Sequence, residues 1–346
     1  MNSMANTPSP VQVLDGLIDG FRHAQAVFAA VALGLPDQLQ DGPRHTAELA
    51  AATGTNPAAL RRLLRYLSAL GVLMQPDHDP DMFALTPVGA LLGAGNPRRA
   101  WAELNAGLYW PAYSALVESL RTGQSGLRHA VGQPVYDILA DRPDLDAAYA
   151  AVMTAATSRV ATALAQAYDF TQCQVVVDVG GGQGMLLAAV LRAYPHLRGI
   201  LLDRPAVVAG APALLTVQGV AERCTVVGGD FFAAVPAGGD VYLIKWVLSD
   251  WDDARAVAIL RACAQAMRPG GSVLVIDPVE QSTSPASDVD SRAFDLDMLV
   301  VWNGGGLRTA EQLAELFTAA GLRLVRVTAG PSPFSIAEGR GVDATA

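Results

Sequence analysis

Apolar and polar positions follow two periods along the second half of the chain. Short apolar runs, bounded by glycine, proline and aspartate, alternate there with stretches whose apolar residues recur every three or four positions. Alternating strand and helix patterns are typical of a parallel, doubly wound α/β sheet. Strands are expected from Val175 onward and at 197–202, 224–227, 241–247 and 272–276, helices at 252–267 and 309–320, and a closing hairpin of strands 322–327 and 334–338.

In the first part of the chain, apolar residues recur mainly at helical spacing. Residues 11–35 carry apolar side chains at helical spacing, and Thr46 can cap a short helix at 47–52. Pro57 then opens a second helix, which Gly71 ends after a stripe of leucines. Short apolar segments on both sides of a turn-rich stretch follow, so this region is predicted to be a winged helix.

Residues 97–170 are expected to be mostly helical, and they are rich in aromatic side chains. Some of these must form core, while others can equally line an apolar pocket. We therefore divide the chain into a winged helix at 11–98, a helical pocket segment at 99–170 and the α/β domain at 171–346. The aromatic residues of the middle segment include Trp101, Tyr109, Trp110, Tyr113, Tyr136 and Tyr149.

A glycine-rich turn follows the first strand of the α/β domain. Its pattern is Asp178-x-Gly180-x-Gly182-x-Gly184, and a helical pattern begins directly after it. Glycine permits positive φ and close approach of a ligand to the backbone, and the helix start offers unpaired N–H groups. A nucleotide-like ligand is the first hypothesis. Because Met185 replaces the third glycine of the dinucleotide fingerprint, a dinucleotide is not favoured.

Carboxylates recur where the predicted strands end, which is where ligands bind in open α/β sheets. Asp203, about 20 residues beyond the glycine turn, can accept hydrogen bonds from ribose hydroxyls. Asp230 and Phe231 can supply an acceptor and an aromatic face for an adenine ring. Lys245 is the only lysine of the chain, which suggests a specific role for it. The aspartates at strand ends are Asp178, Asp203, Asp230, Asp250 and Asp277.

Composition and charge narrow the function. The 346 residues are 51% hydrophobic, with a net charge of −9, which argues against a general nucleic-acid binder. Arg61, Arg62 and Arg65 on the second helix of the winged helix would support DNA binding, but the overall acidity favours a dimerisation module. No apolar run is long enough to span a membrane and no signal pattern is present, so a cytoplasmic protein is expected. Three cysteines without paired spacing indicate neither disulfides nor zinc.

Six motifs then occur in a fixed order and resemble one family. They are residues 178–184, 202–205, 229–231, 244–246, 250–251 and 268–271. With the winged helix, they resemble the S-adenosylmethionine (SAM) dependent O-methyltransferases typified by plant caffeic acid O-methyltransferase, a family that includes bacterial natural-product tailoring enzymes. The resemblance implies a Rossmann-like methyltransferase sheet, an N-terminal winged-helix dimerisation domain and a homodimer.

The resemblance also implies which residues meet the ligands. SAM would be held by the glycine turn, with Asp178, Gly180, Gly182 and Gly184, and by Asp203, Asp230, Phe231 and Lys245. The acceptor molecule would contact Met153, Trp246, Phe294, Met298 and Trp302. Tyr109 and Trp110 are added to this acceptor set from their aromatic cluster. Each acceptor residue could equally belong to ordinary core.

Two departures from the family pattern concern catalysis. Ser249 stands where the family has its histidine base, and Leu307 stands where a glutamate orients that histidine. A further glutamate of the family appears as Asp277. A general base contributes about 10²–10⁴-fold in rate, whereas holding the two reactants in line contributes roughly 7–11 kcal/mol. Methyl transfer can therefore survive without the histidine.

The remaining catalytic candidates are Ser249, Asp250 and Asp277. The Ser249 hydroxyl is no base by itself, and Asp250 could either accept a proton or cap the following helix. A metal ion would need ligands such as Asp250, Asp252, Asp253 and Asp277, but no histidine accompanies them, so none is expected.

The sequence therefore predicts a SAM-dependent methyltransferase acting on a small aromatic or polyketide-like metabolite. Oxygen is the default acceptor atom, and nitrogen and carbon remain open because of Ser249. One alternative is a SAM-binding enzyme on the same scaffold that assists hydroxylation or cyclisation without transferring methyl. A second alternative is a winged-helix regulator that senses SAM.

Overall fold

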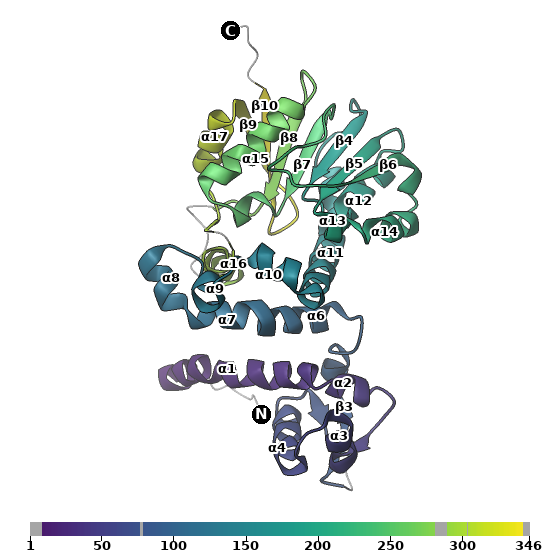
Figure 1. The fold of residues 1–346 in the computed structure, drawn as a ribbon, viewed down its shortest axis with the longest axis vertical. Helices are drawn as coiled ribbons and strands as arrows, with labels where there is room; N and C mark the ends of the chain where they lie inside the picture. The colour runs from purple at the N-terminus through teal and green to yellow at the C-terminus, as the bar shows by residue number, and fades with distance from the viewer. Residues whose placement is uncertain (1–8, 77–78, 281–288, 303, 342–346) are drawn as a thin grey trace, which may run out of the picture. The chain divides into compact units, whose positions relative to one another are not determined.

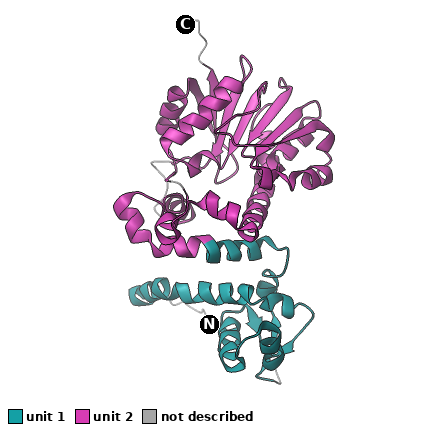
Figure 2. Cartoon of the chain, viewed as in Figure 1, with its two compact units in different colours: residues 1–107 teal, residues 108–346 magenta. Residues whose placement is uncertain are grey.

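The computed structural model describes residues 9–76, 79–280, 289–302 and 304–341. The chain divides into two compact units, residues 1–107 and 108–346 (Figure 2). Residues 99–107 of the predicted pocket segment lie in the first unit, and its remaining residues lie in the second.

The first unit contains a helix pair followed by a small antiparallel sheet with strand order β1-β3-β2. This arrangement agrees with the predicted winged helix. Its elements are α1 (Pro10–Ala32), α2 (Leu35–Gln38), β1 (Arg44–His45), α3 (Thr46–Thr53), α4 (Pro57–Ala69), β2 (Leu73–Met74), β3 (Met82–Leu85), α5 (Pro87–Ala90) and α6 (Pro97–Leu104).

One predicted cap in this unit is wrong. Thr46 is the first residue of α3, and the side chain that caps the helix is His45, whose ring Nδ1 accepts from the backbone N–H of Ala47 at 3.2 Å. The Thr46 hydroxyl instead donates to the carbonyl of Asp81 at 3.0 Å. The threonine therefore joins the helix to the loop before β3, a long-range contact that local spacing does not indicate.

The second unit begins with helices and ends with the large sheet (Figure 1). The helical part consists of the π-helix η1 (Asn105–Tyr109), which crosses the boundary between the units, and α7 (Trp110–Ser114), α8 (Leu116–Thr122), α9 (Gly126–Val131), α10 (Val135–Asp141) and α11 (Pro143–Gln166). The α/β part consists of β4 (Val175–Val179), α12 (Met185–Ala193), β5 (Arg198–Asp203), α13 (Pro205–Val208), α14 (Ala211–Val217), η2 (Ala221–Arg223), β6 (Cys224–Gly228), β7 (Val241–Lys245), η3 (Leu248–Asp250), α15 (Asp253–Ala266), β8 (Ser272–Asp277), α16 (Val289–Val300), α17 (Ala310–Ala319), β9 (Leu322–Ala329) and β10 (Ser335–Gly341).

The seven strands of the large sheet have the order β6-β5-β4-β7-β8-β10-β9. The neighbours from β6 to β8 are parallel, and β10 is antiparallel to both β8 and β9. The doubly wound sheet and its closing hairpin are therefore confirmed. The chain leaves β4 on one side and returns on the other, so the carboxyl ends of β4, β5 and β7 surround the crevice where such sheets bind ligands.

One strand is shorter than expected, because β7 ends at Lys245 and not at Val247. Trp246 adopts a positive φ of 53°, which a strand cannot accommodate. The chain therefore turns sharply directly after the lysine.

Both faces of the sheet are buried. Val176 packs with the α12 residue Leu187 on one face, whereas the neighbouring Val177 packs with the α15 residue Ile259 and the α17 residue Phe317 on the other. Burial on both faces explains the continuous apolar runs of these strands. Within the described residues, no helix combines the length and apolar character that crossing a bilayer requires.

Candidate functional site

The glycine turn after β4 has the backbone that its sequence predicts. Gly180, Gly182 and Gly184 have φ values of 68°, 62° and 87°. A Cβ atom on Gly180 would lie 2.6 Å from a methyl group of Val247, and one on Gly181 would lie 2.5 Å from the Asp178 carboxylate. Side chains are therefore excluded from the turn by both conformation and space.

A cavity of about 580 Å³ lies in the second unit beside this turn. Its wall is formed by residues at the ends of β4, β5 and β7, by the loop after β6, and by side chains of α10 and α11. The predicted SAM residues that line it are Asp178, Gly180, Gly182, Asp203, Asp230, Phe231 and Lys245, and the predicted acceptor residues that line it are Met153 and Trp246. Gly184 is outside this lining and stands at the N-cap of α12.

Asp203 is fixed by backbone donors at the end of β5. The N–H of Gly182 donates to its Oδ2 at 2.8 Å, and the N–H of Arg204 donates to its Oδ1 at 2.7 Å. Burial raises the pKa of this carboxyl, and these two hydrogen bonds oppose the rise. Asp203 therefore ties the glycine turn to the neighbouring strand while it faces the cavity.

Asp178 is a buried carboxylate without hydrogen-bond donors. Its side chain lies at the cavity, the residue is only 1% exposed, and neither oxygen has a hydrogen-bond partner among the described residues. Burial raises its pKa to about 7, although the nearby Lys245 ammonium opposes the rise. An unpartnered buried carboxylate is costly, and it favours a ligand that brings donors or positive charge into the cavity.

Lys245 lies at the centre of this charged group. Burial lowers its pKa to about 8, against the attraction of Asp178, Asp277 and Asp250. Its ammonium lies 4.2 Å from the ring centroid of Trp246, a cation–π contact. Three carboxyl groups thus lie near one ammonium, and Asp178 is the one of the three that lines the cavity.

The three predicted catalytic residues lie together behind the cavity, and none of them lines it. Asp277 accepts from the N–H of Trp246 at 3.0 Å and from the hydroxyl of Ser249 at 3.4 Å, and burial raises its pKa to about 7. Asp250 accepts a 2.5 Å hydrogen bond from the hydroxyl of Tyr136, and burial raises its pKa to about 8. Asp250 does not cap α15; the side chain of Asp252 does.

The predicted acceptor residues outside the cavity lining differ in their surroundings. The Phe294 ring stacks on Trp246 at 6.2 Å, and the Trp302 ring packs 5.7 Å from Tyr136. Met298 is buried in α16 and Tyr109 is partly buried in η1, whereas Trp110 is 42% exposed. Phe294 and Trp302 therefore pack against residues of the wall, whereas Met298, Tyr109 and Trp110 are not among the residues that line it.

Several cavity residues had no assigned role from sequence. Tyr136 and Tyr149 line the wall from α10 and α11, and the aromatic richness of residues 97–170 was their only signal. Arg204 forms an ion pair with Asp146 of α11 at 2.8 Å and lies over the Tyr136 ring at 5.4 Å. These contacts join the helical segment to the end of β5.

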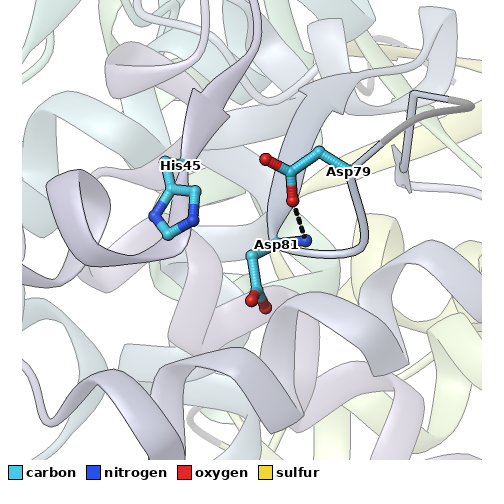
Figure 3. Close-up of side chains that lie close together, drawn as sticks. All are labelled: His45, Asp79 and Asp81. Atoms are coloured by element: carbon cyan, nitrogen blue, oxygen red, sulfur yellow. Dashed lines mark hydrogen bonds between the residues drawn. The ribbon is translucent and has the colours of Figure 1, made fainter.

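The first unit contains a separate group of potential metal ligands, His45, Asp79 and Asp81 (Figure 3). Each already has a protein partner. His45 caps α3, Asp79 accepts from the N–H of Asp81 at 2.8 Å, and Asp81 is ion-paired with Arg61. These contacts account for the group without a metal ion.

Comparison with known proteins identifies the family. Residues 113–323 match the O-methyltransferase domain, and residues 16–94 match the O-methyltransferase dimerisation domain. The chain belongs to the O-methyltransferase family. The chain is 40% identical over 331 residues to the mitomycin biosynthesis 6-O-methyltransferase of Streptomyces lavendulae, and the match covers 94% of this chain and 93% of that one. It is 36% identical to the phenazine O-methyltransferase PhzM of Lysobacter antibioticus, covering 98% of each.

Solved structures of relatives extend the match to three dimensions. The mitomycin 7-O-methyltransferase MmcR superposes with a TM-score of 0.87 at 39% identity, covering 95% of this chain and 97% of that one. An O-methyltransferase from neocarzinostatin biosynthesis, solved with SAM and a naphthoic acid, has a TM-score of 0.80 at 34% identity, covering 92% and 96%. This O-methyltransferase family member is therefore a SAM-dependent methyltransferase. The relatives also include the aclacinomycin 10-hydroxylase RdmB of Streptomyces purpurascens, 36% identical over 322 residues and covering 90% of this chain and 86% of that one.

The buried carboxyls predict how stability depends on pH. Folding raises the pKa of Asp178 and Asp277 to about 7 and that of Asp250 to about 8, from an unfolded value near 3.9. The folded protein therefore binds more protons than the unfolded chain between these values. This contribution to stability is fully present below pH ~4 and is lost as the pH rises through the folded-state values.

Without ligand, the midpoint of thermal unfolding should accordingly fall as the pH is raised from about 5 to about 7.5. Asp178→Asn removes one of the titrating groups and should flatten this slope, whereas Asp137→Asn, at an exposed position of α10, should keep it. Differential scanning calorimetry over this range checks both. A midpoint that rises with pH would contradict the buried-carboxyl account.

Proposed function

We propose that this enzyme transfers the methyl group of SAM to a small aromatic or polyketide-like metabolite, with oxygen as the default acceptor atom and nitrogen or carbon still open. One observation carries the proposal. The same cavity wall brings the unpartnered Asp178 and the half-buried Lys245 beside apolar Met153 and Trp246. The names of relatives support the substrate class, since they act on phenazine, mitomycin and naphthoate compounds.

The residues around the cavity fit SAM chemically. The glycine turn and Asp203 would hold the ribose, Asp230 and Phe231 would hold the adenine, and Asp178 and Lys245 would face the charged methionine part. When bound, SAM supplies an electrophilic methyl group on a positively charged sulfur. The unpartnered Asp178 oxygens and the excess of carboxyls over ammonium groups support this assignment.

The protein's main catalytic contribution would be to hold the two molecules in line. Ser249 does not act as a base in this proposal, because its hydroxyl donates to Asp277 and it lies outside the cavity lining. The walls that fix the acceptor are rigid aromatic side chains, Trp246 among them, which packs on Phe294 and on Phe334 at 4.8 Å. Proximity supplies the larger part of the rate enhancement in such an arrangement.

A second candidate function is hydroxylation or cyclisation assisted by SAM without methyl transfer. The 36% identity to a protein named as a 10-hydroxylase and the serine at position 249 favour it as the alternative. The third hypothesis, a SAM-sensing regulator, needs a basic surface on α4. Arg61 of that helix is ion-paired with Asp81, and the unit matches a dimerisation domain, so this hypothesis has less support.

The dimerisation domain supports a homodimer, and α1 offers a surface for it. Along this helix, four large apolar side chains at helical spacing are 48–75% exposed, namely Leu14, Leu17, Ile18 and Phe21. A continuous apolar face of this kind on a described helix favours burial against a partner. We infer that a second copy of the chain covers it.

Binding of SAM tests the cofactor residues. Lys245→Met and Asp203→Ala should each weaken SAM binding by about 10–100-fold, because each removes an interaction of a charged group worth roughly 1.5–3 kcal/mol. Isothermal titration calorimetry measures the effect, with Asp137→Asn as a control that should bind like wild type. Wild-type affinity in both site variants would remove these residues from the SAM site.

Methyl transfer itself is tested with methyl-labelled SAM and a panel of hydroxynaphthoic acids and hydroxyphenazines. Label in the product is expected. An altered product without label would instead establish the second candidate function. Ser249→His should be assayed in parallel: if hydroxyl methylation occurs only in this variant, the natural acceptor atom is not a hydroxyl oxygen.

The homodimer is tested by placing a charge on α1. Leu17→Glu should convert the protein from a species of about twice the 36.1 kDa chain mass to a monomer, because an ionised carboxylate cannot be buried in an apolar interface at low cost. Size-exclusion chromatography with light scattering measures the mass. Asp15→Asn, on the same helix, is the control and should stay dimeric; a dimeric Leu17→Glu protein would place the interface elsewhere.

A further inference from the structure

Tyr136 connects the cavity to a buried carboxylate. Its side chain lines the cavity from α10, and its hydroxyl donates to Oδ2 of Asp250 at 2.5 Å. Asp250 itself is 4% exposed and lies outside the lining. One hydrogen bond of Tyr136 thus connects a residue of the cavity wall to this buried carboxylate.

The ring of Tyr136 is held in place from several sides. It stacks on Trp251 with centroids 5.4 Å apart and planes at 18°, and it packs 5.7 Å from the Trp302 ring. The Arg204 guanidinium lies over it at 5.4 Å and is anchored in turn by Asp146. A side chain fixed in this way keeps its hydroxyl oriented toward Asp250, which is the preorganisation that proton transfer needs.

We propose that Tyr136 is a catalytic residue, which takes the proton of the acceptor hydroxyl while it passes its own proton to Asp250. This inference rests on the proposed methyl transfer to oxygen. The acceptor O–H bond breaks as the bond from that oxygen to the methyl carbon forms. The released proton binds Oη of Tyr136, the original phenolic proton binds Oδ2 of Asp250, and the carbon–sulfur electron pair stays on sulfur. No oxidation or reduction is involved.

The other polar groups near the cavity are less suited to this step. Ser249 donates to Asp277, and Asp277 already accepts from both Ser249 and the N–H of Trp246. Lys245 carries a proton near neutral pH and lies among carboxyls. Of the described tyrosines that line the cavity, Tyr136 is the one whose hydroxyl is hydrogen-bonded to a carboxylate in this structure.

The acid–base character of the pair agrees with a concerted exchange. Burial raises the pKa of Asp250 to about 8, so the ionised form that can take up a proton becomes the main form only as the assay pH reaches and passes that value. Burial and the charge of Asp250 raise the pKa of Tyr136 well above its usual value, so the tyrosine does not ionise by itself. The groups that face Asp250 are Tyr136 from α10, Asp277 from the end of β8 and Lys245 from the end of β7. Tyr149 of α11 and Tyr109 of η1 also interact with its charge.

We call this transfer of two protons, from the acceptor to Tyr136 and from Tyr136 to Asp250, the relay. It makes the need for Tyr136 depend on the acidity of the acceptor. A hydroxyl that is un-ionised at the assay pH must lose its proton during transfer. An acceptor that is already ionised needs no base at all. A purely structural role of Tyr136 would slow both kinds of acceptor equally.

The test uses Tyr136→Phe, which keeps the ring and removes the oxygen, and Asp250→Asn, which keeps the shape and removes the base. Single-turnover rates are measured with methyl-labelled SAM and substituted hydroxynaphthoic acids whose hydroxyl pKa values lie on both sides of the assay pH. The single-turnover rate of each variant should fall by about 10²–10⁴-fold with un-ionised acceptors and by less than ~5-fold with ionised ones. The double variant should be no slower than either single variant, because the two groups act in series.

Two further measurements separate the relay from a structural effect. SAM affinity by calorimetry should stay within about threefold of wild type in both variants. Tyr168→Phe is the matched control, since this tyrosine donates to the carboxylate of Glu338 at 3.4 Å away from the cavity lining, and it should keep the wild-type dependence on acceptor acidity.

A uniform loss across the acceptor series would overturn the relay, as would a loss that follows weakened SAM binding. If Asp250→Asn does not fold, Tyr136→Phe alone decides the matter. Failure of the wild-type enzyme to label any acceptor would overturn the proposed function and the relay together, whereas labelling by wild type with a uniform Tyr136→Phe loss would overturn only the relay.

Discussion

The site depends on one half-buried lysine held among three buried carboxyl groups. Lys245 ends β7, and Asp178, Asp250 and Asp277 reach it from the ends of neighbouring elements. Burial lowers the pKa of the lysine and raises those of the acids, so each group is destabilised by its surroundings when charged. The four side chains together are therefore unfavourable without a ligand. A ligand that brings positive charge and hydrogen-bond donors would stabilise them most. Ionisable groups whose pKa values are shifted by burial, gathered beside a cavity, are typical of binding sites.

The fold keeps this arrangement rigid through contacts made by the segment after α16. The Arg308 side chain, 9% exposed, donates to the carbonyls of Leu248 and Trp251 at 2.9 and 2.6 Å and pairs with Asp253. The backbone at Gly305 approaches the Ser249 carbonyl so closely that a Cβ atom there would lie 1.8 Å from it. The loop that carries Ser249 and Asp250 is thus fixed from both sides.

The sequence predicts the structure well where the apolar periodicity of a single strand or helix determines it. The strands bury both faces, so their apolar runs are unmistakable, and Asp178 and Asp203 then meet because parallel strands end at one edge. Prediction fails where packing between distant segments decides. The hydrogen bond between Tyr136 and Asp250 joins residues 114 positions apart, and no local pattern indicates it. The same holds for Trp110, whose exposure depends on how α7 packs and not on its own sequence. The roles assigned to individual site residues remain predictions.

The effect of a serine at position 249 on the rate depends on how much a general base contributes compared with the alignment of the two reactants. A general base contributes about 10²–10⁴-fold, which is roughly 3–5 kcal/mol, whereas alignment of two bound reactants contributes roughly 7–11 kcal/mol. Losing the histidine therefore leaves the larger contribution intact, provided that the cavity walls stay fixed. At position 307, where the resemblance places the orienting glutamate, the leucine side chain has no carboxylate, and the Leu307 N–H donates to Asp295 at 2.9 Å. A histidine restored at 249 would lack that glutamate and would have to be oriented by Asp277, which the Ser249 hydroxyl already contacts. The enzyme's catalytic power should thus depend more on the rigidity of Trp246 and its neighbours than on the chemistry of residue 249.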